Sequence, residues 1–245
     1  MPVTPAAKAL LDTFEHIVVI NLSDRGDRRR EIDAELRRAG LSLSHPSVEL
    51  FTAQRPTRTS GFPSLGAHGA FDSHLGVMKR MVEHGWNRVL VLEDDMAFSQ
   101  DFAERLPLIA QSLQERDWAM FYGHPGDLAP EAKVPDANGL ITFPPEEGII
   151  RLHFFGFTTD FARTAIPMLE AMLTRPEGSP EGGPMHVDGA INWVRVAHPE
   201  LTALGVTPQI ARQRPSRSDI AETPWFDRVP VLRSLAALAR RLRKG

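Results

Sequence analysis

Two uninterrupted apolar runs define the centre of the predicted fold. The first covers residues His16–Leu22, and the second covers Arg88–Leu92. Neither run alternates between apolar and polar positions, so each predicts a strand that is buried on both faces, as in a parallel sheet. Three carboxylates, Glu93, Asp94 and Asp95, follow the second run directly. Ligands of open α/β sheets bind at the carboxyl ends of such strands, so this acidic triplet is the first candidate for chemistry.

Segments with helical periodicity separate these strands from further apolar runs. Ile32, Leu36 and Ala39 form the inward stripe of a helix predicted over residues 28–39, which Gly40 ends. Further helices are predicted over residues 71–84, 102–116, 160–174 and after 188, and further strands over 48–51, 118–122, 149–157 and around 206. We expect residues 1–14 to be a short, partly helical leader and residues 127–148 a long connection or flap. The alternation predicts an α/β fold of Rossmann-like type, with a mainly parallel sheet flanked by helices.

Composition narrows the class of protein. The 245 residues are enough for one large domain, which we expect over residues 1–225, and 42% hydrophobic with 24% charged residues is ordinary globular composition. A net charge of −3 gives no reason to expect a nucleic-acid partner. The chain has no cysteine, so any metal must bind to oxygen or histidine ligands. No apolar run approaches the length of a membrane span, and the first residues lack a secretory signal, so we expect a cytoplasmic protein.

The acidic triplet predicts a cation site. Three adjacent acids repel one another, and removing them from water is unfavourable unless a cation or strong hydrogen bonds compensate. A hard divalent ion that also holds a phosphorylated ligand is the natural partner. The alternative, for Asp94 or Asp95 alone, is capping of the following helix. For three acids directly after a buried strand, we favour a site for a metal and a nucleotide.

Basic residues and a histidine are further candidates near strand ends. Arg25, Arg28, Arg29 and Arg30 cluster after the first strand. They are either solvated or bind a diphosphate or a base, since the guanidinium group matches phosphate geometry. His74 lies beside the apolar stripe of its helix, where a hydrogen-bonded structural role is the alternative to a functional one.

The second half of the chain offers one acid and a group of arginines. Asp188 follows a loop rich in proline and glycine, at a position where a helix N-cap is expected, so capping is the alternative to catalysis. Arg212, Arg214 and Arg217 are candidates to close over a diphosphate.

The last residues, 226–245, predict a basic amphipathic helix. Its apolar face consists of Leu232, Leu235, Ala236, Ala239 and Leu242, and its basic residues include Arg233, Arg240, Arg241, Arg243 and Lys244. Such helices lie on anionic membrane surfaces, which would place the protein on the inner face of the cell membrane. The alternative is a terminal helix that packs on the domain with its arginines solvated.

Three separated motifs together resemble glycosyltransferase family 25, which comprises lipopolysaccharide and procollagen sugar transferases. They are Val19–Leu22 with Arg25 and the run 27–29, then Gly69–Leu75 against the family's Gly-x-x-x-Ser-His-Leu, and then Val89–Asp95. Their order and spacing match as well. Val187-Asp188 and residues 213–220 match more weakly, so the resemblance covers residues 16–220. Two departures, Gly156–Asp160 and His186, concern the segments expected to face the acceptor.

The resemblance implies a GT-A fold and inverting transfer from a nucleotide sugar, most often UDP-galactose, to a glycan acceptor such as lipopolysaccharide. It implies that Asp95 and Glu93 bind Mn²⁺ or Mg²⁺, and that Asp188 removes the proton of the acceptor hydroxyl. The remaining residues expected to contact the nucleotide sugar are Asn21, Arg25, Arg28, Ser73, His74, Glu93 and Asp94.

Two other functions remain open. A metal-dependent phosphohydrolase could use the same acids, but the chain lacks an Asp-x-Asp-x-Thr/Val nucleophile motif. A catalytically silent module that binds a nucleotide sugar or a glycan would agree with the departures near Asp160 and His186.

Overall fold

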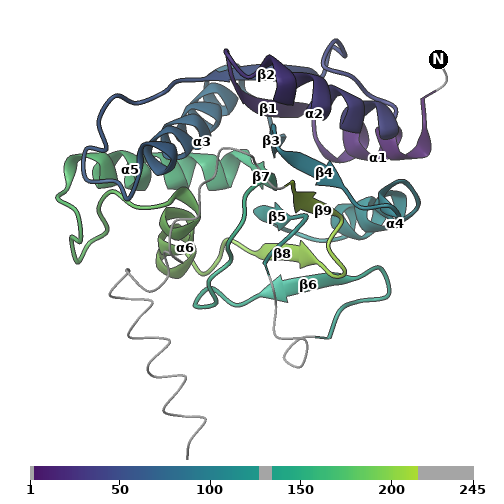
Figure 1. The fold of residues 1–245 in the computed structure, drawn as a ribbon. Coiled ribbons are helices and arrows are strands. Elements are labelled where there is room, and N and C mark those ends of the chain that lie inside the picture. Colours follow the sequence, from purple (N-terminus) through teal and green to yellow (C-terminus); the bar gives the residue numbers. More distant parts are fainter. Residues whose placement is uncertain (1–2, 127–133, 215–245) are drawn as a thin grey trace, which may run out of the picture.

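The main sheet combines strands from residue 16 to residue 206 of the described chain. The computed structural model describes residues 3–126 and 134–214. Within these residues a seven-stranded sheet has the order β2-β1-β3-β7-β5-β8-β6 (Figure 1). The strands are β1 (His16–Leu22), β2 (Val48–Ala53), β3 (Arg88–Glu93), β5 (Met120–Tyr122), β6 (Leu140–Phe143), β7 (Phe154–Thr158) and β8 (Ala203–Val206). A separate two-stranded ribbon pairs β4 (Met96–Phe98) with β9 (Ala211–Gln213).

The strand directions confirm the predicted fold class. Strand β1 pairs in parallel with β2 and β3, and β5 pairs in parallel with β8. Strand β7 is antiparallel to both β3 and β5, so these two groups run in the same direction, and β6 is antiparallel to β8. The described residues therefore form a mixed α/β domain with a mainly parallel sheet flanked by helices, as predicted.

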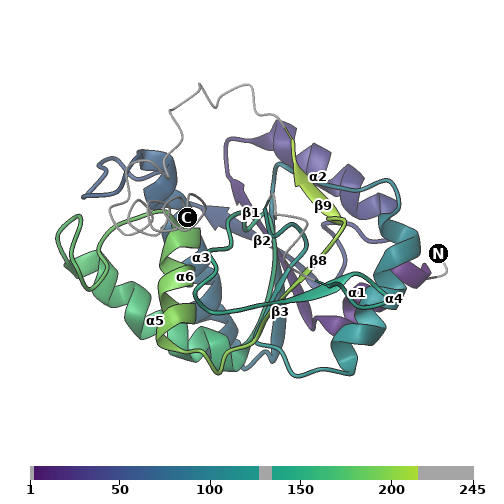
Figure 2. The same ribbon diagram turned by 90° about the horizontal axis from the view of Figure 1, so that it is seen from below.

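Helices cover both faces of the sheet (Figure 2). Helices α1 (Pro5–Thr13), α2 (Gly26–Arg38) and α4 (Phe102–Gln114) pack with Ile17 and Val19 of β1 in one apolar layer. Helices α3 (Leu65–His84), α5 (Thr159–Thr174) and α6 (Val187–Ala197) pack with Val18 in the other layer. Because alternate residues of β1 and β3 are buried in opposite layers, these strands have the unbroken apolar pattern seen in the sequence.

Four segments differ from their predictions. The expected leader is partly helical as predicted, with α1 capped by Thr4, but Ala6, Ala7 and Leu10 of this helix are buried in the core. The expected flap contains the edge strand β6. Strand β7 begins at Phe154, later than predicted. The ribbon β4–β9 was not predicted at all, because each of its strands is only three residues long and carries no periodic signal.

The predicted basic helix over residues 226–245 lies outside the described residues, as does Arg217. Within residues 3–126 and 134–214, no helix has both the length and the apolar character needed to cross a membrane. The proposed division into a domain and a C-terminal tail stays a prediction.

Candidate functional site

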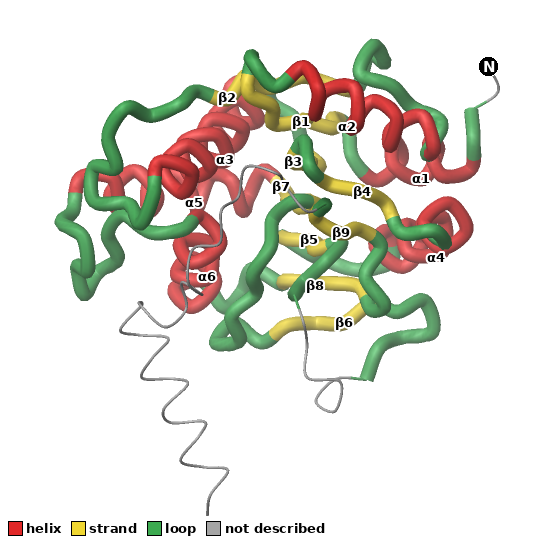
Figure 3. The backbone as a smooth tube through the Cα atoms, in the orientation of Figure 1, coloured by secondary structure: helices red, strands yellow, loops and turns green. Residues whose placement is uncertain are grey.

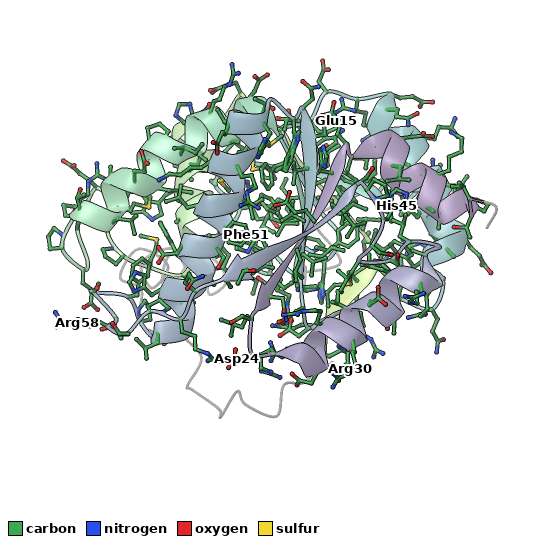
Figure 4. The ribbon with its side chains drawn as sticks, turned by 90° about the horizontal axis from the view of Figure 1, so that it is seen from above. Glu15, Asp24, Arg30, His45, Phe51 and Arg58 are labelled. Atoms are coloured by element: carbon green, nitrogen blue, oxygen red, sulfur yellow. The ribbon has the colours of Figure 1, made fainter. Side chains whose placement is uncertain are left out.

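A cavity of about 290 Å³ opens at the carboxyl ends of β1, β2 and β3. This volume is at the lower end of the range of ligand pockets, roughly 300–1,000 Å³. Asp24 after β1 and Arg30 in α2 lie at this edge of the sheet, whereas Glu15, which precedes β1, lies at the opposite edge (Figure 4). The first turns of α3 and the loop that precedes it form the other wall, and this loop is the long green connection between β2 and α3 in Figure 3.

Most of the predicted ligand-binding residues line this cavity. They are Asn21, Arg28, Ser73, His74, Glu93, Asp94 and Asp95, and the cavity is completed by Ile20, Leu22, residues 53–56, Leu65, Gly66, Gly69 and Ala70. Two predicted residues, Arg25 and Asp188, do not line it. The structure therefore brings one group of these polar side chains together from three segments of the chain, and their roles in binding stay a prediction.

The acidic turn, residues 93–95, accepts hydrogen bonds from residues early and late in the described part of the chain. Asn21 donates a hydrogen bond of 2.8 Å to Asp94, and Arg28 donates one of 2.9 Å to the other oxygen of that carboxylate. Arg28 also lies 3.4 Å from Asp95, to which Gln213 donates a hydrogen bond of 3.2 Å. Neither acid caps a helix, because the N-cap of α4 is Asp101. The capping alternative for Asp94 and Asp95 is therefore wrong.

Burial and mutual repulsion perturb the acids of this turn. Burial, reinforced by the negative charge of Glu93, raises the pKa of Asp95 to about 6. Burial would also raise the pKa of Glu93, but the hydrogen bond and charge of His74, together with Arg28, outweigh it and lower that pKa. Strongly perturbed carboxyl groups in a cavity are typical of ligand-binding and catalytic sites.

Ser73 and His74 in α3 have different roles although they are adjacent in sequence. The Ser73 hydroxyl donates a hydrogen bond of 2.6 Å to the Gly69 carbonyl within the same helix. The His74 ring is buried, and its Nε2 lies 3.3 Å from the Glu93 carboxylate. His74 is thus both a structural residue of the core and a direct neighbour of the acidic turn.

His153 is a neighbour of Glu93 that sequence analysis missed. It precedes β7, and its carbonyl accepts a hydrogen bond of 3.2 Å from the Glu93 N–H. Its ring is buried, its Nε2 has no hydrogen-bond partner among the described residues, and burial lowers its pKa to about 4. Only the antiparallel pairing of β7 with β3 brings the two residues together, and no local pattern in the sequence reports that pairing.

The arginines after β1 have different environments. Arg25 forms an ion pair of 2.9 Å with Asp27 at the start of α2 and does not line the cavity, although its carbonyl accepts a hydrogen bond of 3.3 Å from the Asn21 side chain. Arg29 donates a hydrogen bond of 3.1 Å to the side-chain oxygen of Asn21. Arg30 is exposed. Among these four arginines, Arg28 is therefore the one that reaches the acids directly.

Arg214 supports the backbone of the acidic turn. Its N–H and its guanidinium group donate hydrogen bonds of 2.7 Å to the carbonyls of Asp95 and Asp94, respectively. It also lies 3.2 Å from Glu31 of α2. Arg212 is exposed in β9. Of the late arginines that the structure describes, Arg214 contacts the site, but through the protein backbone of the turn.

Asp188 lies in the first turn of α6, and the N-cap of that helix is His186. The capping interpretation of Asp188 is therefore wrong. Its carboxylate accepts hydrogen bonds from the N–H groups of Gly189, at 2.9 Å, and of Arg151. Burial raises the pKa of Asp188, and the negative charge of Glu93 acts in the same direction. The two carboxylates are thus close enough to influence each other, although Asp188 lies outside the cavity lining.

The acidic turn has the donor chemistry for a hard divalent cation. Asp95 carries a buried carboxylate oxygen, Oδ1, that has no hydrogen-bond partner among the described residues. Within those residues, no three carboxylate or histidine side chains cluster closely enough to hold an ion by themselves. This arrangement fits Mg²⁺-like sites, in which one or two carboxylates act together with substrate phosphates and water. Asp95 and Glu93 are the residues that would supply the protein ligands.

Fold and site together define an α/β protein with an acidic ligand cavity at the carboxyl edge of its sheet. The family model described as glycosyltransferase family 25 (LPS biosynthesis protein) matches residues 62–125, which include α3 and the acidic turn. The chain is 27% identical over 149 residues to procollagen galactosyltransferase 2 of Homo sapiens, covering 52% of this chain and 24% of that protein. The resemblance to glycosyltransferase family 25 is therefore supported by the family model over two of the three motifs and by a similar protein named as a galactosyltransferase.

Two further relatives show the range of the similarity. A glycosyltransferase 25 family member of Drosophila pseudoobscura pseudoobscura is 30% identical over 148 residues, covering 53% of this chain and 24% of that protein. The inactive glycosyltransferase 25 family member 3 of Mus musculus is 26% identical over 139 residues, covering 49% of this chain and 24% of that protein. The chain thus spans about a quarter of the length of each of these relatives.

Proposed function

We propose that this protein is an inverting, metal-dependent glycosyltransferase that moves a hexose from a UDP-sugar to a hydroxyl of a glycan acceptor. In this proposal the sugar is galactose, in keeping with the name of the human relative, and the acceptor is lipopolysaccharide or another cell-surface saccharide. The site of action is the cytoplasm or the inner face of the cell membrane. One observation carries the proposal: Asn21, Arg28 and the acids of the turn meet in a single cavity at the carboxyl edge of the sheet.

The cavity suits a nucleoside diphosphate because it combines two kinds of wall. Ile20, Leu22, Ala53 and Pro56 supply apolar surface against which a base or ribose can pack, and Asn21 and Arg28 supply hydrogen-bond donors. Arg28 is partly buried, with its side chain 16% exposed, so its charge acts with little screening by water. We propose that Arg28 contacts a phosphate of the donor, and that Asn21 contacts the acidic turn and the ribose of the donor. Ser73 and His74 complete the wall from α3.

Mn²⁺ or Mg²⁺ held by Asp95 and Glu93 would neutralise charge on the departing diphosphate. The chain itself must bind the donor, hold the acceptor and accept a proton. Inverting transfer needs no covalent sugar–enzyme intermediate, so one carboxylate must take the proton of the attacking hydroxyl. We assign this role to Asp188, because its raised pKa makes it a stronger base than an ordinary aspartate and the Arg151 and Gly189 N–H groups fix its orientation.

Ligand-induced stabilisation tests the donor site. The protein is heated with UDP-, GDP-, CDP- and ADP-sugars, each with and without Mn²⁺. A ligand at 100 times its Kd that binds only the folded state adds about 2.7 kcal/mol to the free energy of unfolding. We expect a Mn²⁺-dependent rise in melting temperature with UDP-galactose. No rise with any nucleotide sugar would contradict the proposal.

A silent binding module is the second candidate function. It is favoured by the similarity to a relative that is itself named inactive, and by Arg28, whose positive charge already compensates Asp94 and Asp95. Release of UDP in the presence of glycan acceptors separates the two candidates. A transferase releases UDP only with a suitable acceptor, whereas a module binds the donor and releases none.

A further inference from the structure

The inner face of α6 carries a polar group that the proposed function does not use. Arg195 is 1% exposed, and its guanidinium group donates hydrogen bonds of 2.6 Å to the Glu147 carbonyl and 2.9 Å to the Pro144 carbonyl. A third hydrogen bond of 2.9 Å joins Arg195 to the side-chain oxygen of Asn192. Arg195 therefore ties the turn at residues 144–147 to α6.

Asn192 extends this connection by two residues. Its side-chain amide donates a hydrogen bond of 2.8 Å to the Ile149 carbonyl, and its side-chain oxygen accepts one of 3.0 Å from the Ile149 N–H. Asp188, Asn192 and Arg195 are spaced at four and three residues, so they lie on the same face of the helix. Segment 144–151 is thus attached to α6 along the whole length of that face.

The attached segment ends at the residue that binds Asp188. The Arg151 N–H donates a hydrogen bond to the Asp188 carboxylate. Arg151 has φ of +86°, a left-handed conformation that is unfavourable for a residue with a Cβ. Such conformations persist only where surrounding contacts over-determine them, and they cluster at functional sites. The contacts that Asn192 makes with Ile149, two residues earlier, are of this kind.

A purely structural role for Arg195 and Asn192 would not require a buried network of hydrogen bonds. Burying a guanidinium group is unfavourable, and a buried polar network is often no more stable than apolar packing of the same volume. The neighbouring residues Ile191 and Val194 already provide apolar packing for α6. What directional hydrogen bonds add is a fixed position for the backbone that they hold.

We propose that Arg195 and Asn192 are positioning residues that fix segment 144–151 and, through the Arg151 N–H, the orientation of the Asp188 carboxylate. This inference rests on the proposed function, in which Asp188 is the base. It assigns Arg195 and Asn192 no contact with donor or acceptor.

Kinetics and amide hydrogen exchange together test the proposal. The variants are Arg195→Met and Asn192→Leu, and the control is Ile109→Ala, which perturbs the core on the opposite face of the sheet. We expect both variants to lower kcat roughly 10- to 100-fold, as is typical when a catalytic group is misplaced by about 1 Å, with the KM for the donor within about twofold of the wild type. Exchange at the Arg151 amide should become faster in both variants and stay unchanged in the control.

Each other result overturns the inference. A kcat of Arg195→Met within about twofold of the wild type would leave Arg195 and Asn192 with a structural role only. An equal loss of kcat in Ile109→Ala at matched melting temperature would have the same meaning. Loss of kcat with unchanged exchange at Arg151 would show that the effect does not pass through this hydrogen bond. If Arg195→Met fails to fold, Asn192→Asp is judged by the same criteria, since it keeps the side-chain volume, replaces the donor to the Ile149 carbonyl with a carboxylate oxygen and keeps an acceptor for Arg195. A wild type without turnover would instead contradict the proposed function, and the positioning role would fall with it.

Discussion

The Asp95 carboxylate lowers the stability of the fold that presents it. Its pKa of about 6 lies above the ordinary value of 3.8, so the folded state binds the proton more tightly than the unfolded state. Protonated Asp95 therefore contributes its full stabilisation to the folded state below about pH 4, and this contribution is lost as the pH rises through 6. Asp95→Asn removes the charge but keeps an acceptor for Gln213, so it should raise the free energy of unfolding at pH 7.5 by up to about 3 kcal/mol.

Urea denaturation of both proteins at pH 7.5 and pH 4 checks this prediction. The difference between them should shrink at pH 4, where Asp95 of the wild type is protonated in the folded state. A variant that is less stable than the wild type at pH 7.5 would show that burial and the charge of Glu93 do not destabilise the Asp95 carboxylate.

Protonation of Asp95 should stabilise the fold but weaken the binding of the donor. A protonated carboxyl group is a poor ligand for a cation, so Mn²⁺-dependent binding of the UDP-sugar should weaken as the pH falls through about 6. Calorimetric titrations between pH 7.5 and 5 measure this dependence. Asp95→Asn should show weak binding at every pH, and retention of full Mn²⁺-dependent affinity in that variant would remove Asp95 from the site.

Replacement of Asp188 should lower the rate of catalysis without changing the binding of the donor. Asp188→Asn keeps the shape of the side chain but removes the base, so kcat should fall by roughly 10²–10⁴. The donor affinity should stay unchanged, because Asp188 does not line the cavity. Initial rates with saturating donor, together with a donor titration, provide the two readings, and an unchanged kcat would reassign the base.

At the scale of elements, the strand β7 shows where sequence analysis succeeds and where it ends. The buried strands and the helices that follow them were predicted because apolar periodicity is a local signal. The place of β7 between β3 and β5, antiparallel to both, depends on contacts between residues far apart in the chain. For the same reason Glu93 was predicted as a site residue from its position at a strand end, whereas its neighbour His153 was not.

Gly156 is a closely packed residue of β7. An added Cβ would lie 2.5 Å from a ring carbon of Phe14, the residue that ends α1. Gly156→Ala should therefore lower the free energy of unfolding by about 1–3 kcal/mol through overpacking. Gly26→Ala is the matched control, because an added Cβ there meets its nearest neighbour at 3.8 Å. Thermal or urea unfolding of both variants measures the effect, and equal stabilities would contradict it.

At the scale of the whole molecule, the candidate site joins the two ends of the described chain. Asn21 and Arg28 come from the first elements, and Gln213 and Arg214 from the last. The first pair was predicted, because it follows a strong strand signal and matches a family motif. The contacts of the second pair depend on the short ribbon β4–β9, which the sequence does not reveal.

Arg214→Ala tests this connection between the ends. The variant leaves the buried Asp94 carbonyl without its guanidinium donor, which should lower the free energy of unfolding by about 1–3 kcal/mol and weaken Mn²⁺-dependent donor binding. Arg212→Ala is the control, since Arg212 is exposed in β9, two residues before Arg214. If both variants bind the donor as the wild type does, the Arg214 guanidinium group has no part in shaping the turn for donor binding.

The distance along the chain between the acidic turn and its last support also bears on biosynthesis. Arg214 follows Asp94 by 120 residues, so a ribosome that adds 5–20 residues per second needs roughly 6–24 s to synthesise the intervening chain. During that interval Asp94 and Asp95 can lie at the end of a formed β3, but β9 does not yet exist to cover them. Until then the hydrogen bonds of Gln213 and Arg214 to the turn cannot form, so the cavity takes its final form only after most of the sheet has been made.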